Sequence, residues 1–122
     1  MATRATIAVQ NEDETFSSIY SHWDGHPSHV GRILFNHYQT PDKIQKLIDN
    51  GDVSNFDEDG TAYHYKEFST APTTSACYFD LIADVLNGGT EYLYVFSEGH
   101  WEYVDVRDMN NLRRPLELAV QK

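Results

Sequence analysis

Residues 91–106 read EYLYVFSEGHWEYVDV, and this stretch decides the fold. Two runs rich in Tyr, Val and Trp, residues 91–96 and 100–106, flank the turn Ser97-Glu98-Gly99. β-Branched and aromatic residues on both sides of a short glycine-containing turn are typical of a β-hairpin. We therefore expect a sheet that contains this hairpin.

The N-terminal part of the chain predicts another hairpin. Residues 3–9 are rich in Thr, Ile and Val, residues 11–14 are a polar turn, and residues 16–23 supply the partner strand. One further strand is expected between two polar stretches. The expected order there is a polar connection over residues 52–60, a strand over 61–68 and a Thr/Ser/Pro loop over 69–75.

Helices are predicted from apolar spacing and from capping residues. Apolar side chains recur at i, i+3, i+4 and i+7 along residues 30–38. Thr40-Pro41-Asp42 is a good start for the next helix, which Asn50-Gly51 closes. Residues 77–86 are apolar on most of the circumference, so this helix is expected to be largely buried. A short terminal helix is expected over residues 112–120.

These elements predict a single α+β domain over residues 1–122. Its sheet should be mainly antiparallel, built from two hairpins plus one strand, and covered by three to four helices. A chain of 122 residues allows one domain. With 40% hydrophobic and 13% aromatic residues, it is too apolar for a disordered acidic tail.

Negative charge is concentrated in the middle of the chain. The 19 Asp and Glu outnumber the 9 Lys and Arg, for a formal charge of −10, and residues 47–106 hold 12 of these acids with Lys66 as their single base. Such a chain is poorly suited to nucleic acid or anionic lipid. No stretch reaches the roughly 20 apolar residues that cross a membrane. The single Cys77 fits a reducing compartment, so we expect a cytoplasmic protein.

The acidic segment also supplies candidate interface residues. Carboxylates attract a basic partner protein, and Tyr or Trp among them make good interface anchors. The alternative is a solvated acidic face that maintains solubility. The expected interaction surface consists of Asp49, Asp52, Asp57, Glu58, Asp59, Glu98 and Glu102, with Trp101 and Tyr103 as anchors.

A polar cluster, YSHWDGHPSH at residues 20–29, could form a pocket. Aromatic rings next to imidazoles and a carboxylate suit a small, nucleotide-like ligand. Without such a ligand, the cluster is a strand-to-helix turn in which Asp24 and Ser28 satisfy free amides while Trp23 packs beneath. The residues of the alternative pocket are His22, Trp23, Asp24, His26 and Tyr38.

A metal-dependent hydrolase that uses the same imidazoles is the second alternative. Two histidines and one carboxylate form a common metal-binding face, and zinc accepts imidazole ligands. The candidate sets are His22 and Asp24 with His64 or His100, or His26 with His29. The sequence has no nucleophile elbow and no phosphate-binding glycine loop. We expect no catalytic residue, no cofactor and no bound metal.

Part of the sequence also resembles a known group of proteins. Residues 20–27, followed by Val30-Gly31, His37-Tyr38 and Gly51-Asp52-Val53-Ser54, resemble a group of small uncharacterised proteins encoded by bacteriophages. That group shares a His-Trp-Asp-Gly-Tyr-Pro-like core before a helix that ends in His-Tyr. The resemblance implies a phage accessory gene that works inside a bacterial host. Together with the charge, it predicts a non-catalytic protein that binds a basic host or phage protein.

Overall fold

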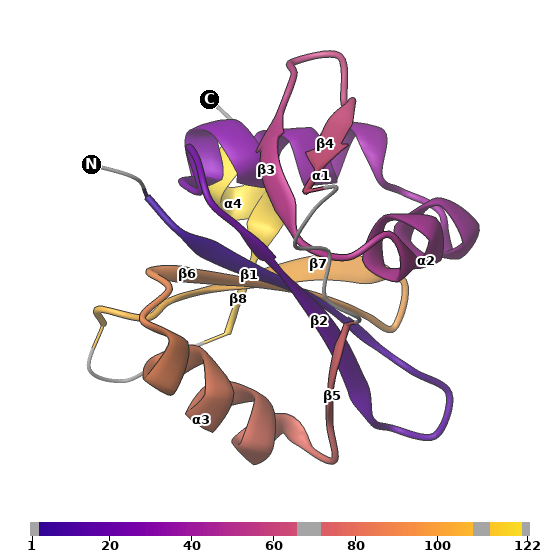
Figure 1. The fold of residues 1–122 in the computed structure, drawn as a ribbon, viewed down its shortest axis with the longest axis vertical. Coiled ribbons are helices and arrows are strands. Elements are labelled where there is room, and N and C mark those ends of the chain that lie inside the picture. The colour runs from indigo at the N-terminus through magenta and orange to yellow at the C-terminus, as the bar shows by residue number, and fades with distance from the viewer. Residues whose placement is uncertain (1–2, 66–71, 109–112, 121–122) are drawn as a thin grey trace.

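The computed structural model describes residues 3–65, 72–108 and 113–120 (Figure 1). In this part of the chain, eight strands form one sheet. The strands are β1 (Ala5–Gln10), β2 (Phe16–Ser21), β3 (Val53–Phe56), β4 (Ala62–His64), β5 (Thr73–Ser75), β6 (Tyr92–Ser97), β7 (His100–Asp105) and β8 (Arg114–Pro115). Their order in the sheet is β4-β3-β2-β1-β6-β7-β8, and β5 pairs with β2 outside this path.

The predicted sheet of two hairpins plus one strand is wrong, because the sheet of the described residues is mixed and has eight strands, although most of its strand pairs are antiparallel. Both hairpins are present, as β1–β2 and β6–β7. They join through a parallel pair in which Ala5 of β1 lies opposite Tyr92 of β6, and β2 meets β3 in parallel at Ser21 and Val53. The sheet is therefore mixed. Local alternation indicates a strand but not the direction in which a distant strand pairs with it.

Helices cover both faces of the sheet. The π-helical turn η1 (Pro27–Gly31), α1 (Arg32–His37), α2 (Pro41–Asp49) and α4 (Leu116–Val120) pack on one face. The opposite face is covered by α3 (Tyr78–Gly88), which lies at the bottom of Figure 1. Adjacent residues of β1 serve the two cores, because successive side chains of a strand point to opposite faces. Ile7 joins the first core and Ala8 the second.

Several element boundaries differ from the sequence-based expectation. The single helix predicted over residues 30–38 is divided into η1 and α1, and the polar connection over 52–60 contains β3. The loop over 69–75 contains β5, and the terminal helix is preceded by β8. Residues 66–68 of the predicted strand, residues 69–71 of the predicted loop and residue 112 of the predicted helix lie outside the described residues. Of the helices in the described part, none is long and apolar enough to cross a membrane.

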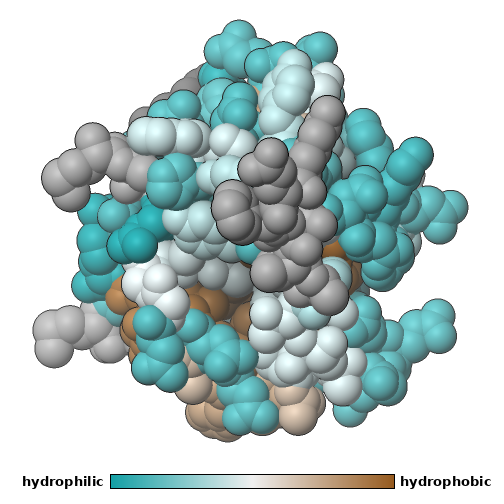
Figure 2. Space-filling view, viewed as in Figure 1, coloured by the Kyte–Doolittle hydropathy of each residue, from teal (hydrophilic) through white to brown (hydrophobic). Residues whose placement is uncertain are grey.

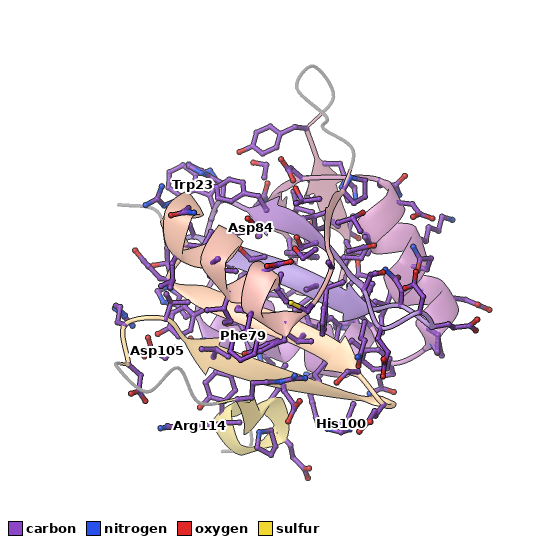
Figure 3. All side chains as sticks on the ribbon, turned by 90° about the horizontal axis from the view of Figure 1, so that it is seen from below. Trp23, Phe79, Asp84, His100, Asp105 and Arg114 are labelled. Atoms are coloured by element: carbon purple, nitrogen blue, oxygen red, sulfur yellow. The ribbon has the colours of Figure 1, made fainter. Side chains whose placement is uncertain are left out.

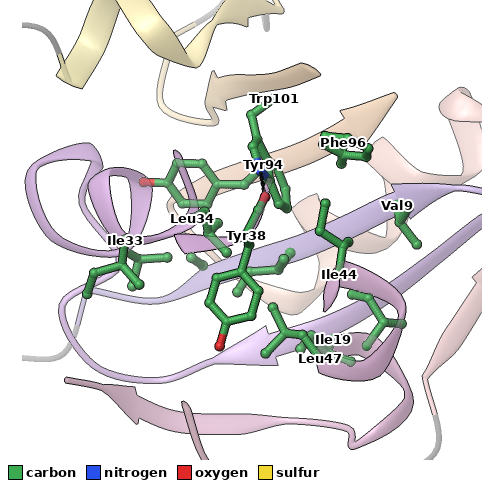
Figure 4. Packing of buried hydrophobic residues seen from close by; sticks show 14 of the residues in the cluster. Val9, Ile19, Ile33, Leu34, Tyr38, Ile44, Leu47, Tyr94, Phe96 and Trp101 are labelled. Carbon is green, nitrogen blue, oxygen red and sulfur yellow. Dashed lines mark hydrogen bonds between the residues drawn. The ribbon is translucent and has the colours of Figure 1, made fainter. Parts of the chain in front are cut away.

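Two buried hydrogen bonds tie the larger core to the surrounding loops (Figure 4). Trp101 Nε1 of β7 donates to the carbonyl oxygen of Tyr38 at 2.8 Å. Tyr94 of β6 donates its hydroxyl proton to the carbonyl oxygen of Gly25 at 2.6 Å. Buried polar groups without partners are costly, so these bonds fix the C-terminal end of α1 and the turn before η1 against the sheet.

Candidate protein-interaction surface

The predicted interaction residues do not form one surface. Asp57, Glu58 and Asp59 form the turn between β3 and β4, whereas Glu98 and Glu102 belong to the β6–β7 hairpin. The β3–β4 pair lies at one end of the strand order, and β7 lies near the other end. The sequence groups these acids in one segment, but the fold distributes them to different edges of the sheet.

The two predicted aromatic anchors belong to the protein interior. Trp101 is 5% exposed and packs its ring edge against Phe96. Tyr103 is half-buried and packs against the same core. The prediction that Trp101 acts as an exposed anchor is therefore wrong. Glu102, which points to the other face of β7, forms an ion pair of 2.7 Å with Arg113 and is partly neutralised.

The carboxylates of Asp49 and Asp52 accept hydrogen bonds from other residues of the chain. Asp49, at the end of α2, accepts a hydrogen bond of 2.9 Å from Gln45 Nε2. Asp52 accepts a bond of 2.9 Å from the backbone amide of Tyr20, and it lines a cavity of about 210 Å³ between α3 and the sheet. Asp52 thus faces a different side of the molecule from the β3–β4 turn.

The fold also places the residues of the alternative pocket in different parts of the molecule. His22 and Trp23 touch edge to face, with ring centroids 4.7 Å apart, and the Trp23 side chain is 46% exposed. The expectation that Trp23 packs beneath the turn is therefore wrong. Tyr38 instead lines a groove with Lys43, Lys46 and His64. The predicted single aromatic pocket is not formed.

The other polar residues of the alternative pocket, Asp24 and His26, lie in the turn before η1. Asp24 adopts a left-handed conformation, with φ of 55°, in the turn before η1. His26 is exposed and occupies the N-cap position of η1, where its side chain makes no capping hydrogen bond. Within the described residues, no group of three His, Cys, Asp or Glu side chains is placed to hold a metal ion.

Asp49 and Glu98 of the predicted surface are exposed but lie on separate elements, whereas the β3–β4 turn keeps three exposed acids side by side. We call Asp57, Glu58 and Asp59 the acidic turn; all three side chains are exposed. The turn is closed by two backbone hydrogen bonds, from the Asp57 amide to the Thr61 carbonyl at 2.9 Å and from the Gly60 amide to the Asp57 carbonyl at 3.0 Å. It projects at the top of Figure 1.

Side chains from α1 and from the residue after it hold the acidic turn in place. Tyr38 donates its hydroxyl proton to the Gly60 carbonyl oxygen at 2.7 Å, and this bond is buried. His37 Nε2 donates to the Glu58 carbonyl oxygen at 3.1 Å. Gly60 has a φ of +95°, and a Cβ there would lie 2.7 Å from His37 Cγ. The backbone of the turn is thus fixed before any partner binds.

Two carboxylates of the acidic turn accept hydrogen bonds from neighbouring residues. The backbone amide of Thr61 donates to Asp59 at 2.9 Å, which lowers the pKa of that carboxyl group. Tyr63 donates to Asp57 at 2.5 Å, and this bond raises the pKa of the Tyr63 phenol. Arg32 approaches Glu58 at 3.8 Å, but both side chains are well exposed, so the pair is weak. The turn therefore carries three exposed acidic side chains, and the ion pair with Arg32 does little to neutralise them.

Tyr63 adds an aromatic ring to the acidic turn. It belongs to β4, and its side chain is 46% exposed. The sequence places Tyr63 on a strand among other tyrosines but does not distinguish the exposed ring from the buried ones. An exposed tyrosine beside carboxylates has the composition of an interface anchor.

Another acidic turn provides a comparison. Glu12, Asp13 and Glu14 between β1 and β2 are also exposed, and Asp13 accepts a hydrogen bond from the Thr15 amide as Asp59 does from Thr61. Polar bonds from Asn11 to Thr15 and Ser17 hold this turn. It matches the acidic turn in charge, whereas the acidic turn also carries the Tyr63 ring.

Sequence reasoning missed the outer face of α3. This helix was expected to be largely buried, but Phe79 is 85% exposed and Leu86 is 51% exposed. The view onto α3 in Figure 3 shows Phe79 near the N-terminal end of the helix. The spacing of Phe79, Ala83 and Leu86 at i, i+4 and i+7 was a detectable signal, because it marks a separate apolar stripe beside that of Leu81 and Val85.

No protein-family model, no curated protein and no solved structure matches this chain.

Proposed function

We propose that this chain is a non-catalytic phage accessory protein that acts in the bacterial host cytoplasm, in host takeover or against host defence. It binds a basic surface on a host or phage protein through the acidic turn and Tyr63. The observation that carries this proposal is the fixed backbone of the turn. Three exposed carboxylates stand on a backbone held by the buried Tyr38 hydroxyl.

A fixed turn binds with a smaller entropic cost than a mobile one. A loop that becomes ordered on binding loses conformational entropy, and this loss makes the binding free energy less favourable. Because Tyr38 and His37 already hold the turn, most of this loss has occurred during folding. The carboxylates then steer a basic partner toward the turn, and the Tyr63 ring supplies apolar contact area.

Capture from a bacterial lysate tests the proposal. Immobilised protein should retain a basic partner at low salt and release it as the salt concentration rises, because screening weakens interactions between exposed charges. Mass spectrometry identifies the retained protein, and binding is then repeated with that protein in pure form.

The variant with Asp57→Asn, Glu58→Gln and Asp59→Asn removes the charge of the turn with little change in side-chain size. Three exposed charge pairs of about 0.2–1 kcal/mol each correspond to an affinity loss of roughly 3-fold to 100-fold. A partner bound equally well by this variant, or equally well at high salt, would contradict the proposal.

A further inference from the structure

A cavity of about 210 Å³ between α3 and the sheet has no role in the proposed binding of a partner protein. Strands β1, β2 and β5 and helix α3 contribute residues to its walls. In Figure 2, the lower half of the molecule is hollowed between α3 and β5, and hydrophobic colour lies inside the hollow. A cavity that combines apolar walls with a few polar side chains has the properties of a small-ligand site.

Ser18 is a buried residue of the cavity wall whose hydroxyl has no partner among the described residues. It is 7% exposed and lines the cavity from β2. Within the described part of the chain, no group forms a hydrogen bond with this hydroxyl, and the hydroxyl is not sealed from solvent as that of Ser21 is. Because buried hydroxyl groups are normally hydrogen-bonded, the Ser18 hydroxyl marks a place where a ligand can bind.

Further hydroxyl groups lie around Ser18. Thr6 and Thr90 also line the cavity, and their Oγ1 atoms form a hydrogen bond of 2.9 Å with each other. Thr73 of β5 lies opposite Ser18 in the antiparallel pairing of β2 and β5. Each hydroxyl oxygen has two lone pairs, so these side chains can accept hydrogen bonds from the N–H or O–H groups of a ligand.

Two acidic side chains also line the cavity, Asp84 of α3 (Figure 3) and Asp52 just before β3. Asp84 accepts a hydrogen bond of 3.1 Å from the Ser75 hydroxyl, and Asp52 accepts one of 2.9 Å from the Tyr20 amide. A carboxylate offers about four lone-pair positions, so both groups can accept further bonds from a ligand. No Lys, Arg or His among the described residues lines the cavity, so the two acids favour a cationic ligand.

The two acids reach different points along β2. Asp84 binds Ser75, which lies opposite the first residue of β2, whereas Asp52 binds the amide of Tyr20. Four residues of strand separate these two points, which corresponds to roughly 13 Å. Ser18 lies midway between them. A ligand that contacts both acids and the Ser18 hydroxyl must therefore be elongated, with polar groups at its ends and near its middle.

We propose that the cavity binds a linear polyamine, of which spermidine is the representative. Its terminal ammonium groups donate to Asp84 and Asp52, and its inner secondary ammonium group donates to the Ser18 hydroxyl oxygen. The methylene groups between the nitrogens pack against Leu81 and Val85, which line the cavity from α3. A neutral sugar would use the hydroxyl groups but would gain nothing from ionic attraction to the two acids.

The polyamine site is separate from the acidic turn. The acidic turn lies at the top of Figure 1, and the cavity lies beside α3 at the bottom. Spermidine binding requires no protein partner, so it is measured on the purified chain alone. Failure of either proposal therefore leaves the other one standing.

Isothermal titration calorimetry of the purified chain with spermidine at physiological salt tests the proposal. We expect a dissociation constant on the order of 0.1 mM. Putrescine, a shorter diamine without the inner nitrogen, should bind roughly tenfold more weakly because it cannot contact Ser18 and both acids together. Ribose should give no heat of binding. No spermidine binding at millimolar concentrations, or Mg²⁺ or ribose binding as tightly as spermidine, would overturn the proposal.

Substitutions in the cavity wall assign the site. Ser18→Ala removes the unpartnered hydroxyl without adding volume and should weaken spermidine binding roughly 2-fold to 10-fold. Asp84→Asn removes an acidic group but keeps an oxygen that can accept from Ser75, and it should weaken binding roughly 10-fold to 100-fold. The control Asp42→Asn makes the same charge change at an exposed position of α2 and should stay within about twofold of the wild type. Equal losses in Asp84→Asn and Asp42→Asn would overturn the assignment.

NMR of the wild-type chain provides a measurement that does not depend on the folding of any variant. On addition of spermidine, the amide signals that shift most should belong to β2, β5 and α3, because these elements line the cavity. Shifts that are largest in the acidic turn, or in the Glu12–Glu14 turn between β1 and β2, would show attraction to exposed acids in place of binding in the cavity. That result would overturn the proposal.

Discussion

Tyr38 connects the core to the acidic turn through three separate contacts. Its hydroxyl donates to the Gly60 carbonyl, its own carbonyl accepts from Trp101 Nε1, and its ring edge meets Phe56 with centroids 6.1 Å apart. Burial raises the pKa of the Tyr38 phenol, so the proton needed for the bond to Gly60 stays in place well into alkaline pH.

Removing the Tyr38 hydroxyl should destabilise the protein. Tyr38→Phe leaves the Gly60 carbonyl without this donor, and we expect the free energy of unfolding to fall by about 1–3 kcal/mol. Tyr63→Phe removes an exposed hydroxyl and should change it by less than about 0.5 kcal/mol. Urea denaturation measures both values. Equal losses in the two variants would show that the Tyr38 bond does not anchor the turn.

Tyr63 should report directly on the carboxylate of Asp57. The neutral phenol donates to that carboxylate, and the phenolate would both lose the bond and be repelled, so the pKa of Tyr63 is raised. Asp57→Asn removes the repulsion and weakens the bond, and the pKa of Tyr63 should fall toward the usual tyrosine value. An NMR pH titration of the Tyr63 ring measures this change. A pKa of Tyr63 that is unaltered in the variant would mean that the two side chains do not pair in solution.

Residue burial was the part that the sequence predicted least well. Alternation places Trp101 and Tyr103 on one face of β7, with Glu102 and Val104 on the other. Whether the Trp101 face meets solvent depends on other parts of the chain, because α1, α2 and α4 complete the core into which Trp101 packs. Residue type favoured an exposed anchor at Trp101, but the tertiary packing buries it.

At the scale of single elements, the β3–β4 turn depends on one glycine. Gly60 adopts a φ of +95°, and a Cβ would collide with the His37 ring. Gly60→Ala should lower the free energy of unfolding by about 1–3 kcal/mol, because it combines backbone strain with steric overlap.

Gly88 provides the matched control for that substitution. It ends α3, and a Cβ there would meet no atom within 4 Å. Gly88→Ala should leave the free energy of unfolding unchanged or raise it by up to about 1 kcal/mol, because alanine favours the helix. Thermal or urea denaturation compares the two variants. A Gly60→Ala variant as stable as Gly88→Ala would contradict the close contact between the turn and His37.

Helices and strands that have a capping residue or an alternating pattern in their own sequence could be predicted. Strands that lack such a pattern could not be predicted. The Thr40 side chain accepts from the Lys43 amide at the start of α2, as the capping pattern predicts. β3 was missed because only Val53 and Phe56 are buried in a four-residue strand followed by acids. β5 and β8 are too short to show alternation, and their pairing partners define them as strands.

At the scale of the whole molecule, β1 holds the two cores together. It pairs with β2 on one side and β6 on the other, and its residues contribute to both cores. We therefore expect the backbone amides of β1 to exchange with solvent most slowly, and those of the edge strands β5 and β8 to exchange earliest. Hydrogen–deuterium exchange followed by mass spectrometry checks this order. Faster exchange in β1 than in the β6–β7 hairpin would contradict the central position of β1.

The distribution of charge is also a property of the whole fold. Most of the acids lie in residues 47–106 of the sequence, yet the fold places Asp52 beside the cavity under α3 and Glu102 against Arg113. Segment charge therefore did not predict one acidic face. The proposed binding surface is therefore limited to the acidic turn and Tyr63. Its contribution to partner affinity must be measured separately from the contribution of the total charge.

The most direct test of the account compares two neutralised turns. The variant Asp57→Asn, Glu58→Gln, Asp59→Asn and the control Glu12→Gln, Asp13→Asn, Glu14→Gln each remove three exposed charges, and each replaces one Asp that accepts a backbone amide. The dissociation constant of the purified basic partner is measured for both variants and the wild type at low salt. We expect the first variant to bind roughly 3-fold to 100-fold more weakly, with the control within about threefold of the wild type. Equal weakening in the two variants would mean that total charge, and not the acidic turn, governs binding.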